Sequence, residues 1–552
     1  MQSLRAWLTT NSVHLDPRLD LVQASGGACS VWANTDVEEG VTVARIPKHL
    51  VLSHRSSSLS PLLSSPSLPS ASLSLVAALH SSPPPLRLAV HVLHELILGP
   101  YSRWATYLAA CPPFRGGQGD ETLAVPIAVL WDEGGEARTW VSGTQLEREL
   151  RRVKIDQHTL STFYNKLVLP LLSSLSLHSQ PTTSSSPTTP PFYIHPLSLS
   201  LFLHAYTLVS TRSFQVDSTG YHALALVPLA DVFNHEQEGV HNVQFVSEVW
   251  VCAECGRVGV CEHDEPDEGD GVSSASAPTL SPTRRQKAQE TDPEEDDTCN
   301  LISVSPIPAG SEAFNHYGPH LSNAKLAVEY GFMVEANEWD VVEFEVGEVF
   351  SILANLCRGG ERVDQVWEEL VEHLVSRGML DLAEHDHPLI APTPLTVDSP
   401  TLSIDADARL STPLWALLVL LASSSSSPSS SSASSPSPLT LVTAQLTSLS
   451  SSLRVLAEWA HQDEGEEGEE AGEREEGADV PPDHVALLRR VAELVQLLAG
   501  ERIRRQNEPE RSGAELLERA DNESVPATRL AIEFVAGERL LLERVQENWT
   551  FL

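Results

Sequence analysis

The sequence predicts an α+β protein, in which a helical segment interrupts a β-rich first part and helices make up the second part. Short runs rich in β-branched residues occur near the amino terminus and return at residues 221–251 and 300–315, as expected for strands. Between them, residues 86–108 and 143–171 show the apolar spacing of helices. The same helical spacing dominates the chain after residue 340. Strands on both sides of a helical segment, followed by helices alone, favour this class.

The first strands are expected between residues 21 and 52. The runs SVWA and VTVARI are separated by DVEEG and end at IPKHL, a pattern typical of two strands joined by a turn. The next clear element is the helix LRLAVHVLHELILG, where Gly99 and Pro100 predict its end.

The last helices carry start signals of their own. Pro481 and Pro482 precede Asp483, which is a favourable helix cap. One apolar stripe at helical spacing then consists of Leu488, Val491, Val495 and Leu498. Residues 528–547 repeat this pattern.

Composition divides the chain further. Four stretches rich in Ser, Pro or charge are expected to be disordered, because they bury too little surface to offset the entropy of ordering. These stretches are residues 53–74, 172–189, about 252–298 and 423–480. The expected domains are a β-rich core in two parts, 1–115 and 205–340, a helical insert, 116–204, and a helical domain, 341–552.

Size, cysteine content and apolar runs limit the class of protein. The 552 residues suffice for two or three folded units. Seven irregularly spaced cysteines favour a reducing compartment over a disulfide framework, and the amino-terminal stretch lacks the pattern of a secretory signal. The longest apolar run, 414–422, is too short to cross a bilayer. We therefore expect a protein of the nucleus or cytoplasm that does not engage a membrane.

The net charge of −39 bears on the partners of the protein. Such acidity disfavours direct binding to nucleic acid and favours basic protein partners through electrostatic attraction. Acidic loops that only keep the protein soluble are an equally good explanation.

Two segments carry candidate chemistry. In ALALVPLADVFNH, a polar cluster of Asp231, Asn234 and His235 follows directly after an apolar strand. Taken alone, a turn and capping cluster explains these residues equally well. The second segment, PIPAGSEAFNHYG, forms a turn and a short strand before Tyr317, and the helical stretch after it ends at Gly331.

Together with the amino-terminal strands, STRSF, DVFNH and YGPHLSNAKLAVEYGF resemble, in this order, the motifs of SET-domain methyltransferases. The class is that of the Rubisco large-subunit methyltransferase and of ribosomal-protein lysine methyltransferases, and the resemblance spans about residues 21–339. It implies a SET core with a helical insert, a pseudoknot in which the two motif segments thread past each other, and an all-α substrate-binding domain. The amino-terminal loop departs from the family, since Ala28 and Ser30 stand where the family has two glycines.

The resemblance also implies roles for individual residues. Tyr317 would be the catalytic tyrosine at the mouth of the methyl-transfer channel. The residues that would bind the cofactor, S-adenosyl-L-methionine, are Ala28, Cys29, Ser30, Thr211, Arg212, Asp231, Asn234, His235 and Tyr330. The residues that would contact the substrate are Trp104, Ser213 and Phe214. For Trp104, a place in the hydrophobic core is the better-supported alternative on sequence grounds.

A candidate metal site lies in the expected insertion of the core. Its four residues, all of types that bind zinc, are Cys252, Cys255, Cys261 and His263. The spacing begins like that of a zinc knuckle, and a bound zinc ion would be structural. The spacer is shorter than in ordinary zinc fingers, so a reduced, disordered hairpin tip is the alternative.

The predicted function is that of a protein-lysine N-methyltransferase that uses S-adenosyl-L-methionine. The expected substrate is a basic, non-histone protein, such as a ribosomal or translation-related protein, and the enzyme is expected to be a monomer. A protein-histidine methyltransferase of the same layout and a non-catalytic SET-like adaptor are the alternatives. The intact DVFNH and YG motifs favour an enzyme, whereas the altered glycine loop favours the adaptor.

Overall fold

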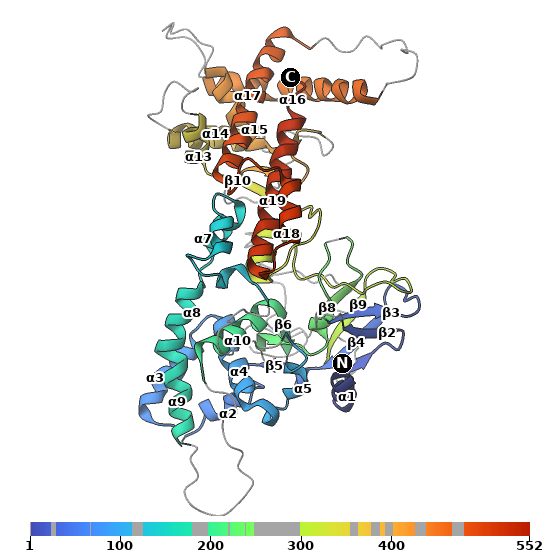
Figure 1. Cartoon of the computed structure of the whole chain (residues 1–552), viewed down its shortest axis with the longest axis vertical. Coiled ribbons are helices and arrows are strands. Elements are labelled where there is room, and N and C mark those ends of the chain that lie inside the picture. Colours follow the sequence, from blue (N-terminus) through green and yellow to red (C-terminus); the bar gives the residue numbers. More distant parts are fainter. Residues whose placement is uncertain are drawn as a thin grey trace, which may run out of the picture. The chain divides into compact units, whose positions relative to one another are not determined.

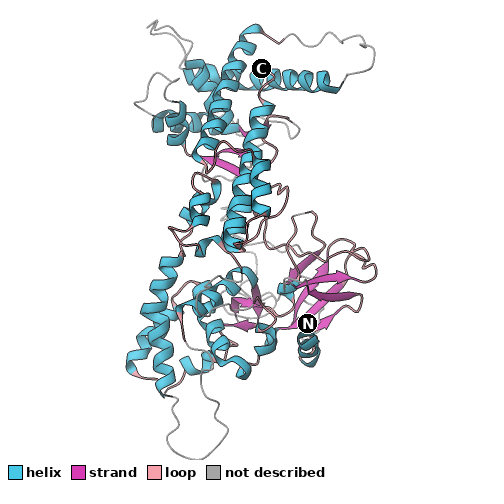
Figure 2. Ribbon diagram, viewed as in Figure 1, coloured by secondary structure: helices cyan, strands magenta, loops and turns pink. Residues whose placement is uncertain are grey.

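The computed structural model describes residues 2–23, 29–66, 68–112, 125–178, 197–218, 221–237, 239–247, 298–353, 363–376, 387–391, 401–424, 438–465 and 480–552. The chain divides into two compact units, each built from several segments (Figure 1). The first unit comprises Met1–Leu130, Lys154–His320 and Glu329–Gly331, and the second comprises Trp131–Val153, Leu321–Val328 and Phe332–Leu552. The predicted α+β class is confirmed, because both units contain helices and strands (Figure 2).

Antiparallel sheets form the β-rich part of the first unit. One sheet has the order β1-β4-β9-β8, with β1 (His14–Leu15), β4 (Thr42–Pro47), β9 (Thr298–Ser303) and β8 (Val243–Val246). The others are the hairpin of β2 (Leu19–Gln23) and β3 (Cys29–Ala33), and a sheet of β5 (Leu52–Ser53), β7 (Tyr221–Leu226) and β6 (Ser213–Ser218). The pairing of β4 with β9 joins strands from opposite sides of the helical segment, so one core, including Val31, Ile46 and Leu301, is built from both parts.

The helices of the first unit are α1 (Gln2–Thr10), α2 (Leu59–Leu63), α3 (Ser70–His80), α4 (Pro84–Leu98), α5 (Ala105–Leu108), α8 (Gln157–Phe163), α9 (Leu169–His178) and α10 (Leu199–Arg212). The α4 and α10 helices pack against each other. The α4 helix begins with prolines, which suit the first turn of a helix, and ends where Gly99 adopts a φ of 54°. The predicted stop at Gly99 is thus confirmed.

The stretch 53–74 differs from its expected disorder, since it contains α2 and the start of α3. Leu59 and Leu63 are buried in the unit. Beside them, the buried carboxylate of Glu95 accepts hydrogen bonds from the hydroxyls of Ser57, at 3.0 Å, and Ser58, at 2.6 Å. A serine-rich segment is ordered here because its hydroxyls have a buried acceptor and its leucines have a core to enter.

The second unit is mainly helical, with a small sheet that the sequence analysis did not anticipate. The sheet has the order β10-β12-β13-β11, with β10 (Val341–Phe344), β12 (Leu402–Asp405), β13 (Leu410–Ser411) and β11 (Ile390–Ala391). The helices are α6 (Glu136–Trp140), α7 (Gln145–Arg152), α12 (Asn323–Glu329, except its last residue), α13 (Val346–Leu353), α14 (Val363–Ser376), α15 (Thr412–Ser424), α16 (Pro438–Gly465), α17 (Pro482–Arg505), α18 (Gly513–Asp521) and α19 (Pro526–Asn548).

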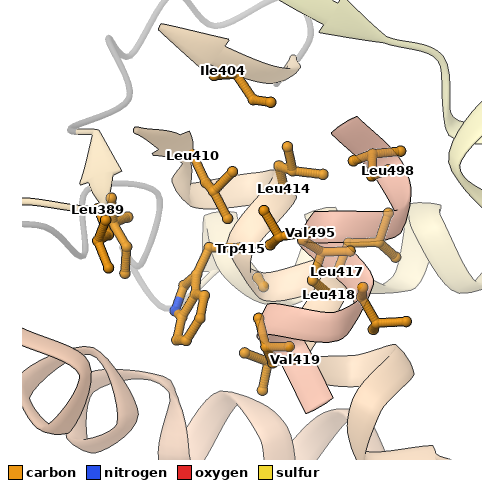
Figure 3. Close-up of a cluster of buried hydrophobic side chains, with 14 of the residues drawn as sticks. Leu389, Ile404, Leu410, Leu414, Trp415, Leu417, Leu418, Val419, Val495 and Leu498 are labelled. Carbon is orange, nitrogen blue, oxygen red and sulfur yellow. The ribbon is translucent and has the colours of Figure 1, made fainter. Parts of the chain in front are cut away.

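The core of the second unit surrounds α15, whose residues 414–422 are all buried (Figure 3). A helix that is apolar on every side is normally buried in a hydrophobic core. This explains the apolar run of residues 414–422. The predicted stripe on α17 is confirmed, since Leu488, Val491, Val495 and Leu498 are all buried. Figure 3 shows Val495 and Leu498 beside Leu414 and Leu417 of α15.

The segment Trp131–Val153, which we expected within the helical insert of the first domain, belongs to the second unit. The backbone N–H of Gln145 donates to Glu538 at 2.7 Å, and Arg148 forms a salt bridge with Glu348 at 2.8 Å. Gly143 adopts a φ of +77°, and a Cβ there would lie 2.7 Å from the carbonyl oxygen of Arg505. Close packing and buried polar bonds therefore fix this segment on the helical unit.

The other stretches expected to be disordered are described only in part. Residues 172–178 belong to α9, and residues 438–465 form α16, so helices replace the expected disorder there. Residues 179–189, 252–297, 425–437 and 466–479 lie outside the described residues. Within the described ranges, no helix has the length and apolar character that a membrane span requires.

Candidate functional site

The two motif segments meet in the first unit. His235 and Asn315 form a parallel bridge, and the N–H of Asn315 donates to the carbonyl oxygen of Asn234 at 2.8 Å. The backbone N–H of Tyr317 donates to Nδ1 of His235 at 3.2 Å. The proximity that the pseudoknot requires is therefore present, and it places the polar cluster of the first motif against the tyrosine of the second.

Tyr317 lies among aromatic rings. Its ring centroid is 5.0 Å from that of His235 and 5.1 Å from that of Tyr330. Its hydroxyl donates to the carbonyl oxygen of Phe233 at 3.2 Å. Burial raises the pKa of the Tyr317 hydroxyl well above its ordinary value and raises the pKa of Tyr330 to about 12. Both phenols are therefore neutral at physiological pH, so they act as hydrogen-bonding groups rather than as bases.

His235 is also uncharged. Burial, with a further contribution from His316 and His241, lowers its pKa to about 4. The ring centroid of His316 is 5.5 Å from that of His235 and 4.9 Å from that of His241. A neutral imidazole explains how Nδ1 of His235 accepts the bond from Tyr317.

A partly buried ion pair of Arg212 and Asp231 lies near Tyr317. Nη1 of Arg212, at the end of α10, donates to the carbonyl oxygen of Asp231 at 3.0 Å and to its Oδ2 at 3.1 Å. The Tyr107 hydroxyl donates to the same Oδ2 at 2.9 Å. Burial raises the pKa of the Asp231 carboxyl, and Arg212 opposes that shift. Arg212 is thus held by two contacts with Asp231, a residue that Tyr107 in turn fixes.

The amino-terminal hairpin of β2 and β3 also contacts the site around Asp231 and Arg212. The β3 strand contacts the short turn Ala230–Val232, which carries Asp231. Cys29, in β3, interacts electrostatically with Arg212, and burial raises the pKa of its thiol. The Ser30 hydroxyl accepts a hydrogen bond from Nε1 of Trp32 at 2.9 Å. Ala28 lies outside the described residues.

Glu312 joins the hairpin to the first motif, although the sequence analysis did not single it out. It forms a bridge with Trp32 of β3, and its carboxylate accepts a hydrogen bond from Nδ2 of Asn234 at 2.6 Å. Burial raises the pKa of this carboxyl. Tyr107 was missed in the same way, because neither residue belongs to a recognisable motif and each acts through a partner far away in the sequence.

The remaining predicted residues have other contacts. Trp104 is buried and donates Nε1 to the carbonyl oxygen of Leu50 at 2.7 Å, so it occupies the core, as the alternative interpretation held. The Thr211 hydroxyl donates to the carbonyl of Thr207, one turn earlier in α10. The ring of Phe214 packs on Phe245 at 4.5 Å, and Ser213 pairs with Leu226 in the β6-β7 ladder.

The polar groups of this site fit a ligand with a carboxylate. Among the described residues, Nε of Arg212 and Oδ1 of Asp231 are buried without a hydrogen-bond partner. A guanidinium fork is suited to a carboxylate, and a buried polar atom is stabilised when a ligand supplies its partner. The methionine part of S-adenosyl-L-methionine carries both a carboxylate and an ammonium group, so the residues fit this cofactor.

The predicted zinc ligands lie outside the described residues. In the described ranges, no group of three or more His, Cys, Asp or Glu side chains is arranged to hold a metal ion.

Comparison with known proteins gives partial matches. No family model matches the chain. Ribosomal lysine N-methyltransferase 3 of Saccharomyces cerevisiae is 33% identical over 166 residues, which cover 25% of this chain and 29% of that protein. An uncharacterized protein of Schizosaccharomyces pombe is 24% identical over 242 residues, 43% of each protein. The chain thus spans less than half the length of these curated relatives.

The solved structures that the chain matches include two of LSMT. The SET domain of LSMT bound to lysine and AdoHcy is 14% identical, with a TM-score of 0.49 over 99% of this chain and 90% of that one. Rubisco LSMT bound to AdoMet is 13% identical, with a TM-score of 0.47 over 99% and 91% of the two chains. On the sequence side, the yeast relative supports the resemblance of this chain to ribosomal-protein lysine methyltransferases.

Proposed function

We propose that the chain is a protein-lysine N-methyltransferase that uses S-adenosyl-L-methionine. The observation that carries the proposal is the contact between Tyr317 and His235, which unites the two distant motif segments in one site. The similarity to a ribosomal lysine methyltransferase supports it.

Methyl transfer to an amine is an in-line displacement, which needs orientation, exclusion of water and an uncharged amine. S-adenosyl-L-methionine supplies the activated methyl group when it is bound. The amine of a lysine has an ordinary pKa of ~10.4, and burial beside a positive charge lowers it. An apolar, partly aromatic channel therefore helps the lysine to lose its proton before transfer.

The neutral Tyr317 hydroxyl would orient this amine. In the free protein the hydroxyl donates to Phe233, and its raised pKa keeps the proton on the oxygen. A phenol that keeps its proton can hold an amine or polarise its surroundings through hydrogen bonds, but it does not remove a proton at neutral pH. Its role in the proposed reaction is therefore positioning and electrostatic stabilisation.

The cofactor would be held from two sides. The unpartnered Nε of Arg212 would bind the methionine carboxylate, with Asp231 fixing the guanidinium. Asn234 and His235 would contact the rest of the cofactor from the first motif, and the β3 residues Cys29 and Ser30 would line it. Ring contact with Tyr317 supports a place for Tyr330 in the same pocket.

The proposed substrate is a basic, non-histone protein that presents a lysine, such as a ribosomal or translation-related protein. The net charge of −39 supports a basic partner through electrostatic attraction. We propose further that the enzyme acts as a monomer in the cytoplasm or nucleus, which size-exclusion chromatography and imaging of a tagged protein test.

One experiment tests the proposed activity. Lysate from cells that lack the protein is incubated with isotopically labelled S-adenosyl-L-methionine and either the wild type or Tyr317→Phe, and labelled peptides are identified by mass spectrometry. We expect labelled lysine with the wild type and not with the variant. Label on histidine would support the histidine alternative instead. No label, with no cofactor binding in a calorimetric titration, would support the adaptor that the Ala28 and Ser30 substitutions favour.

A structural zinc ion remains a prediction for the segment that contains Cys252, Cys255, Cys261 and His263. We expect about one zinc per chain by elemental analysis of the purified protein. Replacement of Cys252 and Cys255 by serine should remove that zinc and leave methyl transfer intact. Zinc-free protein that is unaffected by chelators would contradict the prediction.

A further inference from the structure

The crossing of the motif segments contains a polar side chain without an assigned role. Asn315 is 1% exposed, and in the described part of the chain neither atom of its side-chain amide has a hydrogen-bond partner. Its backbone is fully engaged, since it donates to Asn234 at 2.8 Å and accepts from the N–H of Glu236 at 3.0 Å. Bridges to His235 and Val243 flank it. The backbone of Asn315 is therefore fixed, whereas its side-chain amide makes no hydrogen bond with the described residues.

Such an amide is unfavourable in the free protein. Burial removes the water that would bond its donor and acceptor groups, and nothing described replaces that water. An apolar side chain of similar shape would avoid this cost. A polar group at this position therefore points to a partner that arrives with a ligand.

The position of Asn315 indicates which ligand this is. Asn315 forms bridges with His235 of the first motif and with Val243. It stands two residues before Tyr317, whose backbone N–H donates to the same His235. The other buried polar atoms of this site without a described partner belong to Arg212 and Asp231, which we expect to bind the cofactor.

We propose that the side-chain amide of Asn315 is a further contact for S-adenosyl-L-methionine. The amide presents a donor beside an acceptor, and it matches a ligand edge with the same pair, as an adenine edge has. This inference rests on the proposed function, because it takes the cofactor of that reaction as the ligand.

The test compares cofactor affinity with stability. S-adenosylhomocysteine is titrated into the wild type, Asn315→Leu and Asn315→Ala by calorimetry, and the melting temperature of each protein is measured without ligand. We expect both variants to bind about tenfold more weakly or worse, since each loses the bonds of the amide. The melting temperature of Asn315→Leu should equal or exceed that of the wild type, because an unsatisfied amide is removed.

A matched control is the same substitution at a buried asparagine whose amide is fully bonded. Asn323 donates to the carbonyl of Val334 at 2.9 Å and to Asp340 at 2.8 Å, and it accepts from the N–H of Val334 at 2.8 Å. Asn323→Leu should lower the melting temperature, because it removes the hydrogen bonds of a satisfied amide. This result would show that the measurement detects the loss of buried hydrogen bonds.

Two results would overturn the inference. If the wild type binds S-adenosylhomocysteine and both Asn315 variants bind it equally well, the amide is not a cofactor contact, while the proposed function stands. If the wild type itself does not bind, the proposed function fails and the role of Asn315 fails with it.

Discussion

The Tyr317 hydroxyl is the group on which the proposed chemistry depends most. It keeps its proton at neutral pH because burial raises its pKa, and it donates to Phe233 in the free protein. Replacement by phenylalanine keeps the ring contacts with His235 and Tyr330 and removes only this group. We expect Tyr317→Phe to lower kcat by about a hundredfold or more, as does the loss of one preorganised hydrogen-bond donor in other active sites.

The matched measurement is cofactor affinity. Calorimetry should show that Tyr317→Phe binds S-adenosylhomocysteine nearly as well as the wild type, because the hydroxyl is assigned to the transferred methyl and the amine rather than to cofactor binding. A variant with normal kcat on an identified substrate would show that the role of Tyr317 is wrong.

The sequence predicted the site residues that stand in motifs and missed those that stand outside them. Tyr317, Asp231 and His235 stand in segments whose order is recognisable. Tyr107 and Glu312 do not, yet they fix Asp231 and Asn234 through hydrogen bonds. A bond between residues that are far apart in the sequence leaves no periodicity or spacing to detect, so only the fold reveals it.

Among the elements, α4 carries a pH-dependent contribution to stability. His91 is buried on this helix, its Nδ1 has no partner among the described residues, and burial lowers its pKa to about 3. In the unfolded chain the pKa of a histidine is near ~6.5. As the pH falls from 6.5 towards 3, the unfolded state takes up a proton that the folded state does not, so stability decreases.

The corresponding test is His91→Leu, which removes this proton uptake. Between pH 6.5 and 5, we expect the free energy of unfolding of the wild type to fall by about 2 kcal/mol more than that of the variant. Urea unfolding at several pH values measures the difference. Parallel curves for the wild type and His91→Leu would contradict the prediction.

Composition was a weaker guide to elements than periodicity. The stripe on α17 and the end of α4 were predicted from spacing and from glycine and proline. Residues 53–74 were assigned to disorder because of their serines, but Ser57 and Ser58 bond to the buried Glu95. A serine-rich stretch is ordered when distant residues satisfy its hydroxyls, and composition does not contain that information.

At the scale of the whole molecule, each unit is assembled from segments that are not contiguous. Glu538 of α19 illustrates this in the second unit, where it is buried and accepts from Gln145 at 2.7 Å, Arg502 at 2.9 Å and Gln506 at 3.0 Å. Trp131–Val153, expected in the helical insert of residues 116–204, lies in the second unit. The sequence shows that this segment is helical, but not which core it joins.

We expect Glu538→Ala to lower the free energy of unfolding by about 3 kcal/mol, because it removes the nearer carboxylate partner of the buried Arg502, which keeps only Glu348 at 3.5 Å, and the acceptor of the Gln145 N–H. Urea unfolding followed by circular dichroism measures this. Glu458→Ala removes an exposed pair with Arg454 and should cost less than about 1 kcal/mol. Equal effects of the two substitutions would show that the buried network does not hold the unit together.

In the proposed enzyme, the crossing of the two motif segments holds a sulfonium donor against Tyr317. A crystal structure of the protein with S-adenosylhomocysteine is the decisive test. We expect the ligand carboxylate on Arg212, the sulfur facing the Tyr317 hydroxyl, and the Asn315 amide bonded to the ligand. A ligand bound elsewhere, or one that contacts neither His235 nor Tyr317, would show that the proposed site is wrong.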